Sequence, residues 1–265
     1  ITGGEPLVRE GIVDFIRKIG NIKDIKDITM TTNGFYISKY AKDLKEAGVS
    51  SVNISLDSLN REKFRDITGV DALPDVIEGI NACAKAGLKT KANTVIQRGV
   101  NEDDIFNIID LARFMNVDIR FIEMMPIGHG KTSSGVDNEG ILDCIKRKYG
   151  NIEKVEIRRG NGPAEYIKIP GFKGAIGFIG AVHNKFCESC NRIRFTSTGK
   201  LKPCLCYNSD IDISDILKDN SLSSEEKNKR LKNSIRECIE KKPHSHSFED
   251  LSKVSELKDM SEIGG

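Results

Sequence analysis

The sequence predicts an α/β fold, an incomplete (β/α) barrel followed by a region of short strands and helices. Two observations lead to this prediction. Up to about residue 125, strand-like and helix-like segments alternate, and after a further helix short strands are separated by Gly-rich turns. Alternating strands and helices are typical of a parallel sheet covered by helices, because parallel strands need long crossover connections. The chain of 265 residues is long enough for one large domain or for a domain with an appendage.

Hydrophobic spacing predicts the elements of the alternating part. Helices are expected at residues 7–19, 37–47, 75–86 and 103–115, and strands at 27–32, 51–56, 89–96 and 117–125. Residues 1–7 are expected to end one strand and to lead into a helix. In a barrel, the loops after the strands share one face, where binding sites form. Residues 32–34, 57–59, 97–99 and 126–128 are therefore expected at that face.

We place a domain boundary after residue 137. Residues 1–137 are expected to form the partial barrel, and residues 138–265 to complete it and to form a C-terminal region with a cysteine cluster and a Gly-Gly tail. A helix is expected at 138–149 and short strands at 153–157, 164–169 and 175–178. The charged segment 212–257 is expected to be a helical outer cover, whose apolar face carries Leu231, Ile235, Cys238 and Ile239.

The composition by itself gives no argument for a nucleic-acid or membrane surface. The net charge is only +2, and no apolar run approaches the roughly 18 residues of a membrane span. No basic and apolar signal segment stands at the start, so a cytoplasmic location is expected. Four of the seven cysteines lie between positions 187 and 206. In a reducing compartment, such clustering indicates metal binding rather than disulfides.

The strongest functional signal is the pair Cys187 and Cys190, followed fourteen residues later by Cys204 and then by Cys206. A CxxC turn lets two thiolates converge on one metal or cluster, and a second loop supplies the remaining ligands. Four cysteines would complete a tetrahedral zinc site, whereas three thiolates on a four-iron cluster leave one iron open for a substrate atom. The spacing alone slightly favours zinc.

Two arginines beside the cysteines favour the iron–sulfur alternative. Arg192 and Arg194 lie two residues apart, so we expect them on the same face of a strand. Guanidinium groups are always charged and form bidentate hydrogen bonds with phosphates, which suits a triphosphate beside an open cluster. An exposed basic strand edge is the alternative. At the start of the chain, residues 3–6 (Gly-Gly-Glu-Pro) form a turn whose backbone groups can approach a ligand.

Together with further motifs, these residues make the chain similar, from its first residue to its last, to the GTP 3',8-cyclase family of molybdenum cofactor biosynthesis, within the radical S-adenosylmethionine (SAM) superfamily. The motifs are Gly3-Gly4-Glu5-Pro6, Thr31-Thr32-Asn33-Gly34, Asn53-Ile54-Ser55-Leu56-Asp57, Lys91-Ala92-Asn93, Arg120-Phe121-Ile122-Glu123, Cys190-Asn191-Arg192-Ile193-Arg194 and Gly264-Gly265. The resemblance implies a radical SAM barrel and the conversion of GTP to 3',8-cyclo-7,8-dihydro-GTP, the first step of molybdopterin biosynthesis.

The resemblance also implies roles for individual residues. Contacts to SAM are implied for Gly4, Glu5, Ser55 and Met125. Contacts to GTP or its phosphates are implied for Thr31, Lys91, Arg192 and Arg194. The last two would be catalytic, because they hold the triphosphate so that C3' of the ribose faces the radical formed from SAM. A [4Fe-4S] cluster that binds the guanine base would be held by Cys187, Cys190 and Cys204. Cys206 would not be a ligand, and Gly264-Gly265 would reach toward the active site.

Radical SAM enzymes also need a second [4Fe-4S] cluster bound by a CxxxCxxC motif, which this sequence does not contain. The family places that motif upstream of Gly3-Gly4, so we expect an N-terminally truncated chain that is inactive alone. A homodimer and a downstream partner enzyme, cyclic pyranopterin monophosphate synthase, are also expected. His244 and His246 are expected on a solvated surface. The rival interpretations are another radical SAM enzyme with an auxiliary cluster and a non-catalytic zinc-ribbon binding module.

Overall fold

The computed structural model describes residues 1–155, 160 and 162–263, which form two compact units. The first unit contains residues 1–124 and 133–184, and the second contains residues 125–132 and those from Lys185 onward. Residues 138–184 thus belong with the first unit, whereas the sequence analysis placed its boundary after residue 137. Gly264-Gly265 lie outside the described residues. In the part that the structure describes, no helix is both long and apolar enough to cross a membrane.

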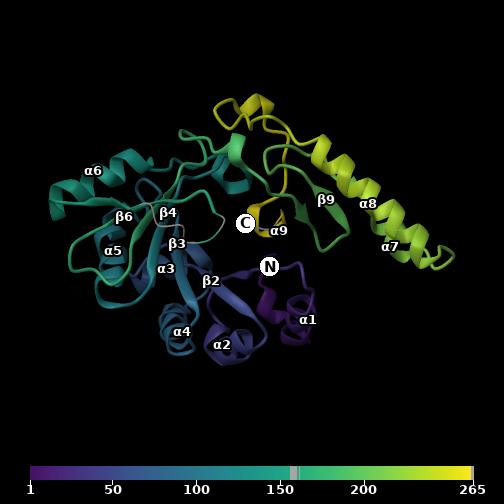
Figure 1. Ribbon diagram of the computed structural model, residues 1–265. Coiled ribbons are helices and arrows are strands. Elements are labelled where there is room, and N and C mark those ends of the chain that lie inside the picture. Colours follow the sequence, from purple (N-terminus) through teal and green to yellow (C-terminus); the bar gives the residue numbers. More distant parts are fainter. Residues whose placement is uncertain (156–159, 161, 264–265) are drawn as a thin grey trace. The chain divides into compact units, whose positions relative to one another are not determined.

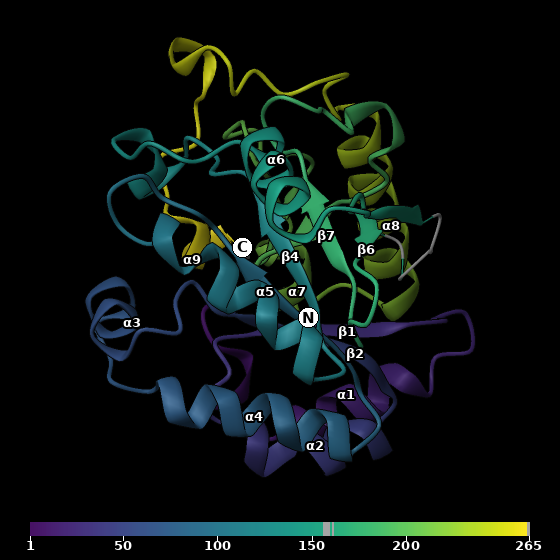
Figure 2. The same ribbon diagram turned by 90° about the vertical axis from the view of Figure 1, so that its left-hand side faces the viewer.

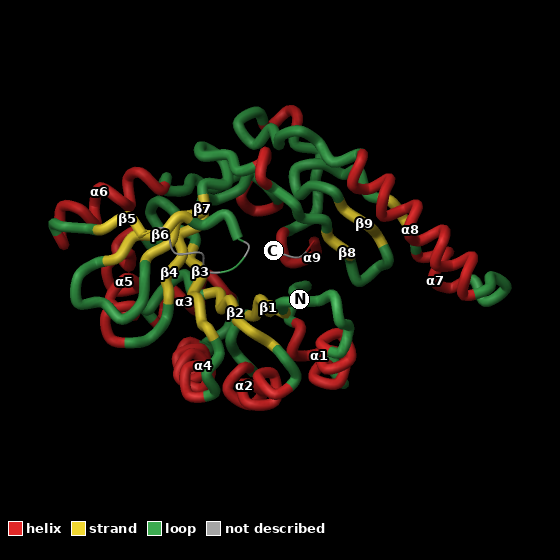
Figure 3. Tube along the Cα trace, in the orientation of Figure 1, coloured by secondary structure: helices red, strands yellow, loops and turns green. Residues whose placement is uncertain are grey.

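A seven-stranded mixed sheet runs through the first unit (Figures 1 and 3). Its strand order is β1-β2-β3-β4-β7-β6-β5. In this order, β1, β2, β3, β4 and β7 pair in parallel with one another. Strands β6 and β5 follow β7 and pair antiparallel. The strands are β1 (Ile28–Thr32), β2 (Val49–Ser55), β3 (Lys89–Thr94), β4 (Asp118–Ile122), β5 (Glu153–Val155), β6 (Glu165–Lys168) and β7 (Ile176–Ile179). The predicted α/β class with a large parallel sheet is confirmed.

The helices of the first unit largely follow the predicted positions. They are η1 (Pro6–Val8), α1 (Ile12–Gly20), α2 (Ile37–Glu46), α3 (Arg61–Thr68), α4 (Leu73–Lys85), η2 (Glu102–Asp104), α5 (Ile105–Phe114) and α6 (Asn138–Tyr149). The single helix predicted at 7–19 was wrong, because the chain is interrupted at Gly11, whose φ of +69° precedes α1. Helix α3 was not predicted. The local signal for the start of α3 is the N-cap residue Asn60, whose Oδ1 accepts hydrogen bonds from the backbone N–H groups of Glu62 and Lys63.

One face of the sheet is apolar and packs against helices. Ile54 on β2 and Phe121 on β4 are fully buried. Helices α2 and α4, which contact the sheet, lie side by side (Figure 2). Their close approach depends on Gly79 in α4, where a Cβ atom would lie 2.3 Å from Cγ2 of Ile37. Cys83, predicted as a core residue, is fully buried on α4, and burial raises the pKa of its thiol to about 12.

A three-stranded antiparallel sheet and one long helix organise the second unit. The strands β8 (Arg194–Phe195), β9 (Lys200–Lys202) and β10 (Ile211–Asp212) pair in the order β10-β9-β8. The helices are η3 (Gly128–Lys131), η4 (Cys187–Ser189), α7 (Ser214–Lys218), α8 (Ser224–Glu240), η5 (Leu251–Lys253) and α9 (Met260–Ile263). A capping box begins α8, because Ser223 and Glu226 each bond to the other's backbone N–H.

The helical cover predicted at residues 212–257 is present only in part. Helices α7 and α8 form its first half, whereas residues 241–259 are irregular apart from η5. On α8, Leu231 and Cys238 contribute to a small core. Ile235 and Ile239 are 38% and 55% exposed, which corrects the prediction that they are covered. The periodicity predicts which face of α8 is apolar, but the small core beneath α8 covers only part of that face.

A buried ion cluster joins β9 to the C-terminal segment of the second unit. The ammonium group of Lys202 is fully buried and lies 2.8 Å from Oδ1 of Asp210 and 2.5 Å from Oε2 of Glu256. Oε1 of Glu256 accepts hydrogen bonds from the backbone N–H groups of Leu257 and Lys258. Because a buried charge is costly unless it is paired, this cluster holds the segment around Glu256 on β9.

Candidate functional site

Polar side chains lie along one face of the large sheet. The strand register places Thr31, Asn53 and Lys91 beside one another, and Ser55, Asn93 and Arg120 form the next row. Because side chains alternate along a strand, all six lie on the same face. Lys91 and Arg120 are only 6% and 8% exposed. The first unit therefore holds two cationic side chains on this face, with the buried carboxylate of Asp118 in the row of Lys91.

The guanidinium group of Arg120 joins three strands. Its Nε and Nη2 donate to Oδ1 of Asn93 at 2.8 and 2.6 Å, and Nη2 also donates to Oδ1 of Asn53 at 2.7 Å. Asn53 in turn donates to Oγ1 of Thr31 at 3.2 Å. Gly177 leaves room for this arrangement, since a Cβ atom there would lie 3.1 Å from Cγ of Arg120. Arg120 belongs to one of the family motifs but had no predicted role, although a charged residue within a buried strand is a signal that the sequence contains.

The turn of Gly3, Gly4 and Glu5 lies at the carboxyl end of β1. Oε1 and Oε2 of Glu5 accept hydrogen bonds from Oγ1 of Thr32 at 2.8 and 2.9 Å, and Oε2 also accepts one from the backbone N–H of Asn33 at 2.7 Å. Gly3 has a φ of +148°, which few other residues adopt, and among the described residues no atom beyond the chain neighbours of Gly4 lies within 4 Å of a Cβ built there. The turn is thus fixed by Glu5, while the backbone of Gly4 is left open.

The residues expected to contact SAM are divided between the two units. Gly4, Glu5 and Ser55 belong to the first unit, where Ser55 ends β2 and is exposed. Met125 belongs to the second unit, where its carbonyl oxygen accepts a hydrogen bond from the backbone N–H of Ile127 at 2.8 Å.

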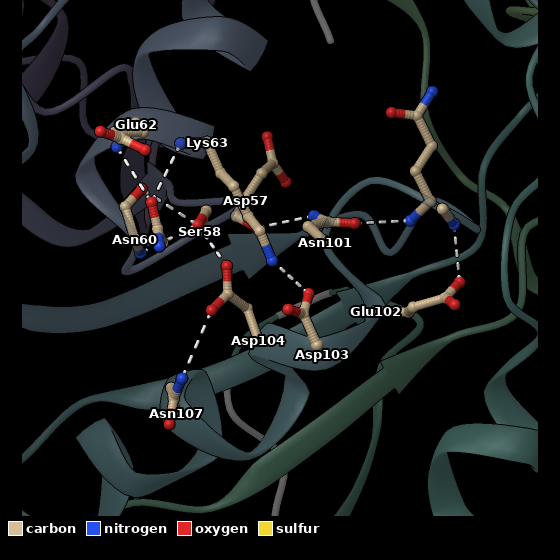
Figure 4. A network of polar contacts seen from close by, with 12 residues as sticks. Asp57, Ser58, Asn60, Glu62, Lys63, Asn101, Glu102, Asp103, Asp104 and Asn107 are labelled. Carbon is tan, nitrogen blue, oxygen red and sulfur yellow. Dashed lines mark hydrogen bonds and ion pairs between the residues drawn. The ribbon is translucent and has the colours of Figure 1, made fainter.

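A polar network joins the loops that follow β2 and β3 (Figure 4). Oδ1 of Asp57 accepts a hydrogen bond from the backbone N–H of Val95 at 2.8 Å. Nδ2 of Asn101 donates to the carbonyl oxygens of Asp57 and Val95 at 2.6 and 3.0 Å. The hydroxyl group of Ser58 donates to Asp104. Burial raises the pKa of Asp57 to about 6, although the N–H of Val95 opposes the shift.

The predicted cysteine ligands lie in two neighbouring segments of the second unit. Cys187 begins η4, and its carbonyl oxygen accepts a hydrogen bond from the backbone N–H of Cys190 at 3.0 Å. Arg194 pairs with Lys202 in the β8–β9 ladder, so the segments that carry Cys190 and Cys204 run antiparallel beside each other. Burial raises the pKa of the Cys204 thiol, and the nearby Cys187 and Cys190 thiols add to this shift. The Cys204 thiol thus lies within electrostatic range of the Cys187 and Cys190 thiols.

The Cys190 thiol has a pKa below its usual value. Burial alone would raise this pKa, but the backbone N–H of Arg192 and the ammonium group of Lys242 outweigh burial. Thiolates rather than thiols bind metals, so the surroundings of Cys190 favour the thiolate, which is the metal-binding form. The sequence analysis did not consider Lys242, which lies far from the cysteines along the chain.

The segment of residues 244–248 covers part of the cysteine region, and only one of its two histidines lies on the solvated surface predicted for them. His244 is exposed, but His246 is only 6% exposed. The backbone N–H of His246 donates to Sγ of Cys187 at 3.5 Å, and that of Ser247 donates to Sγ of Cys206 at 3.5 Å. The prediction was wrong for His246, because the local charge pattern does not reveal a partner almost 60 residues away.

Arg192 and Arg194 were expected on the same face of a strand, but only Arg194 lies in a strand. Arg194 begins β8, whereas Arg192 precedes the strand and stacks over Phe186, with its Cζ 5.4 Å from the ring centroid. Burial lowers the pKa of Arg194, and the neighbouring charge of Arg192 lowers it further. Two guanidinium groups thus share the second unit with the three thiols.

The cysteines are the candidate ligands for a metal centre in the second unit. Among residues 1–155, 160 and 162–263, no three His, Cys, Asp or Glu side chains form a group arranged to hold a metal ion. A zinc ribbon uses four thiolates around a single ion, whereas in a four-iron cluster each thiolate binds a different iron.

Comparisons with known proteins cover the whole chain. Residues 1–112 match the family model "Radical SAM superfamily", and residues 117–248 match "Molybdenum Cofactor Synthesis C". A GTP 3',8-cyclase of Clostridium perfringens is 45% identical over 265 residues, which are 100% of this chain and 80% of that protein. Proteins of the same name from Thermodesulfovibrio yellowstonii and Listeria monocytogenes are 42% and 38% identical, with the same shares covered. These matches confirm the resemblance on which the sequence analysis relied.

Proposed function

Because this chain belongs to the GTP 3',8-cyclase family of radical SAM enzymes, we propose that it converts GTP to 3',8-cyclo-7,8-dihydro-GTP in the first step of molybdenum cofactor biosynthesis. The observation that carries this proposal is the identity of 45% to the relative from Clostridium perfringens over the full chain. The reaction is that of a lyase. The structure supports the proposal with a polar sheet face in the first unit and with thiols and guanidinium groups in the second.

The family uses SAM and [4Fe-4S] clusters. A [4Fe-4S] cluster on a CxxxCxxC motif, which this sequence does not contain, would with SAM supply the radical chemistry that joins C3' of GTP to C8. We assign one cluster to Cys187, Cys190 and Cys204, because the Cys204 thiol lies within electrostatic range of the other two. Cys206 is fully buried and its sulfur accepts the N–H of Ser247, which suits a packed residue.

In this proposal, the chain's own residues bind and orient the substrates. In the first unit, the open backbone of Gly4 and the exposed Ser55 contact SAM, with Glu5 holding the turn in place. Thr31 and Lys91 contact GTP from the polar face of the sheet. In the second unit, Met125 contacts SAM, and Arg192 and Arg194 hold the triphosphate, since paired guanidinium groups bind phosphates with defined geometry.

Two further parts of the proposal rest on the resemblance alone. They are the transfer of the product to cyclic pyranopterin monophosphate synthase and the formation of a homodimer.

GTP binding by the chain, reconstituted anaerobically with iron and sulfide, tests the proposed role of the arginines. Arg192→Ala and Arg194→Ala should each weaken GTP binding about 10- to 100-fold, because each removes hydrogen bonds between charged groups. Arg236→Ala, an exposed arginine of α8, is the control and should leave binding unchanged. Equal affinity of all four chains for GTP in calorimetry would count against the proposed phosphate contacts.

Iron analysis tests the proposed cluster ligands in the same preparations. Cys204→Ser should lose most of the iron and sulfide, whereas Cys206→Ser should keep the wild-type amount. Equal losses in both variants would contradict the three-cysteine assignment. One zinc ion per wild-type chain, without sulfide, would support the zinc-ribbon alternative instead.

A further inference from the structure

Lys242 connects the two backbone segments that carry the proposed cluster ligands. Its Nζ donates hydrogen bonds to the carbonyl oxygen of Arg192 at 2.8 Å and to that of Pro203 at 2.9 Å. Arg192 lies two residues after Cys190, and Pro203 immediately precedes Cys204. The ammonium group of Lys242 therefore links the two segments close to Cys190 and Cys204 in the chain.

The fold determines the position of Lys242. It follows the end of α8, where its backbone N–H donates to the carbonyl oxygen of Ile239 at 3.2 Å. Near that end, Cys238 packs with Leu201 of β9 and with Ile213. The small core of the second unit thereby anchors the end of α8 beside the strand that leads to Cys204. A cation is also favourable near a helix C-terminus.

The positive charge of Lys242 lies beside the segments that carry Cys190 and Cys204, because its Nζ is hydrogen-bonded to the carbonyl oxygens of Arg192 and Pro203. Its half-buried position weakens screening by solvent. Among the described residues, the guanidinium groups of Arg192 and Arg194 also carry positive charge in these segments.

We propose that Lys242 is a positioning residue for the iron–sulfur cluster of the second unit, an inference that rests on the proposed function. It holds the Cys190 and Cys204 segments at a fixed spacing, so that the cluster can be taken up. Its positive charge also stabilises the additional negative charge of the reduced cluster, which raises the reduction potential. Hydrogen bonds and charges around the sulfurs are known determinants of such potentials.

Three variants separate this role from a general effect of removing a lysine. Lys242→Met keeps the chain length but removes both the hydrogen bonds and the charge. Lys242→Arg keeps the charge and the donors. The matched control is Lys241→Met, because the neighbouring Lys241 is exposed. Among the described contacts, its side chain pairs only with Glu237, and Nζ lies 2.6 Å from Oε1.

The readouts are iron and sulfide per chain after anaerobic reconstitution, and the midpoint potential from a reductive titration followed by EPR. We expect Lys242→Met to take up less than half of the wild-type iron, and the clusters that form to have a more negative potential. Lys242→Arg should restore most of the iron and the potential, and Lys241→Met should match the wild type. If Lys242→Met does not fold by circular dichroism, Lys242→Gln replaces it, with the same expectations.

Wild-type iron and potential in the Lys242→Met chain would overturn the inference, and so would an equal effect of Lys241→Met. If the wild type takes up no [4Fe-4S] cluster, or keeps it in Cys204→Ser, the proposed function fails and the inference fails with it. A cluster-loaded wild type that loses its cluster in Cys204→Ser, combined with unaffected Lys242 variants, refutes the inference alone.

Discussion

Replacing Asp57 by asparagine should stabilise the first unit at neutral pH and have little effect in acid. Burial raises the pKa of this carboxyl group from 3.8 to about 6 in the folded chain. Between these two values the folded chain binds more protons than the unfolded chain, so stability falls as the pH rises. At about 1.36 kcal/mol per pKa unit, ionised Asp57 costs about 3 kcal/mol at pH 7.5 but only about 0.5 kcal/mol at pH 4.

Asparagine retains the Oδ1 atom that accepts the N–H of Val95, and it carries no charge. The assay is urea unfolding of the wild type and of Asp57→Asn at several pH values between 4 and 8. The difference in unfolding free energy between the two chains cancels the titration of all other groups. We expect this difference to grow by about 2.5 kcal/mol in favour of the variant between pH 4 and pH 7.5.

Asp71→Asn is the control, with the opposite sign. Asp71 is exposed, and its hydrogen bond with Arg61 lowers the pKa of its carboxyl group. Such a group adds stability above its unfolded pKa and loses it as the pH falls through its folded pKa. Asp71→Asn should therefore lower stability slightly at neutral pH. A stability difference for Asp57→Asn that does not change with pH would refute the reasoning.

Two further predictions concern packing and buried charge. Lys202→Met should lower the unfolding free energy by about 3–5 kcal/mol, because it leaves the buried carboxylates of Asp210 and Glu256 without their cation. A loss below about 1 kcal/mol in urea unfolding would show that the ion cluster contributes little. Gly177→Ala should cost about 1–3 kcal/mol, because its Cβ would lie 2.7 Å from Cε1 of Tyr166. Gly4→Ala, with open space around its Cβ, should leave the melting temperature unchanged, and equal melting temperatures of both variants would contradict the packing argument.

The order and type of most elements could be predicted because the signals are local. Apolar spacing and strand–helix alternation predicted β1 to β4 and most of their helices within a few residues. Helix α3 was missed because it is short and polar, with Phe64 its one residue given as buried, and its clearest local signal is the cap at Asn60. Ile239 was placed in a covered face because periodicity shows which face is apolar, but not how much core lies beneath it.

The sequence by itself determined the family, which is written in contiguous motifs, and the α/β class, which follows from the alternation of strands and helices. Only the tertiary structure decided which distant groups surround the residues of these motifs. Lys242 and His246 meet the cysteine segments across about 50 to 60 residues of chain. Arg120 meets Asn53 across 67 residues. The pKa of Asp57 likewise depends on burial by neighbouring loops. Such contacts arise from strand register and helix packing, which depend on the whole chain, so a local pattern cannot contain them.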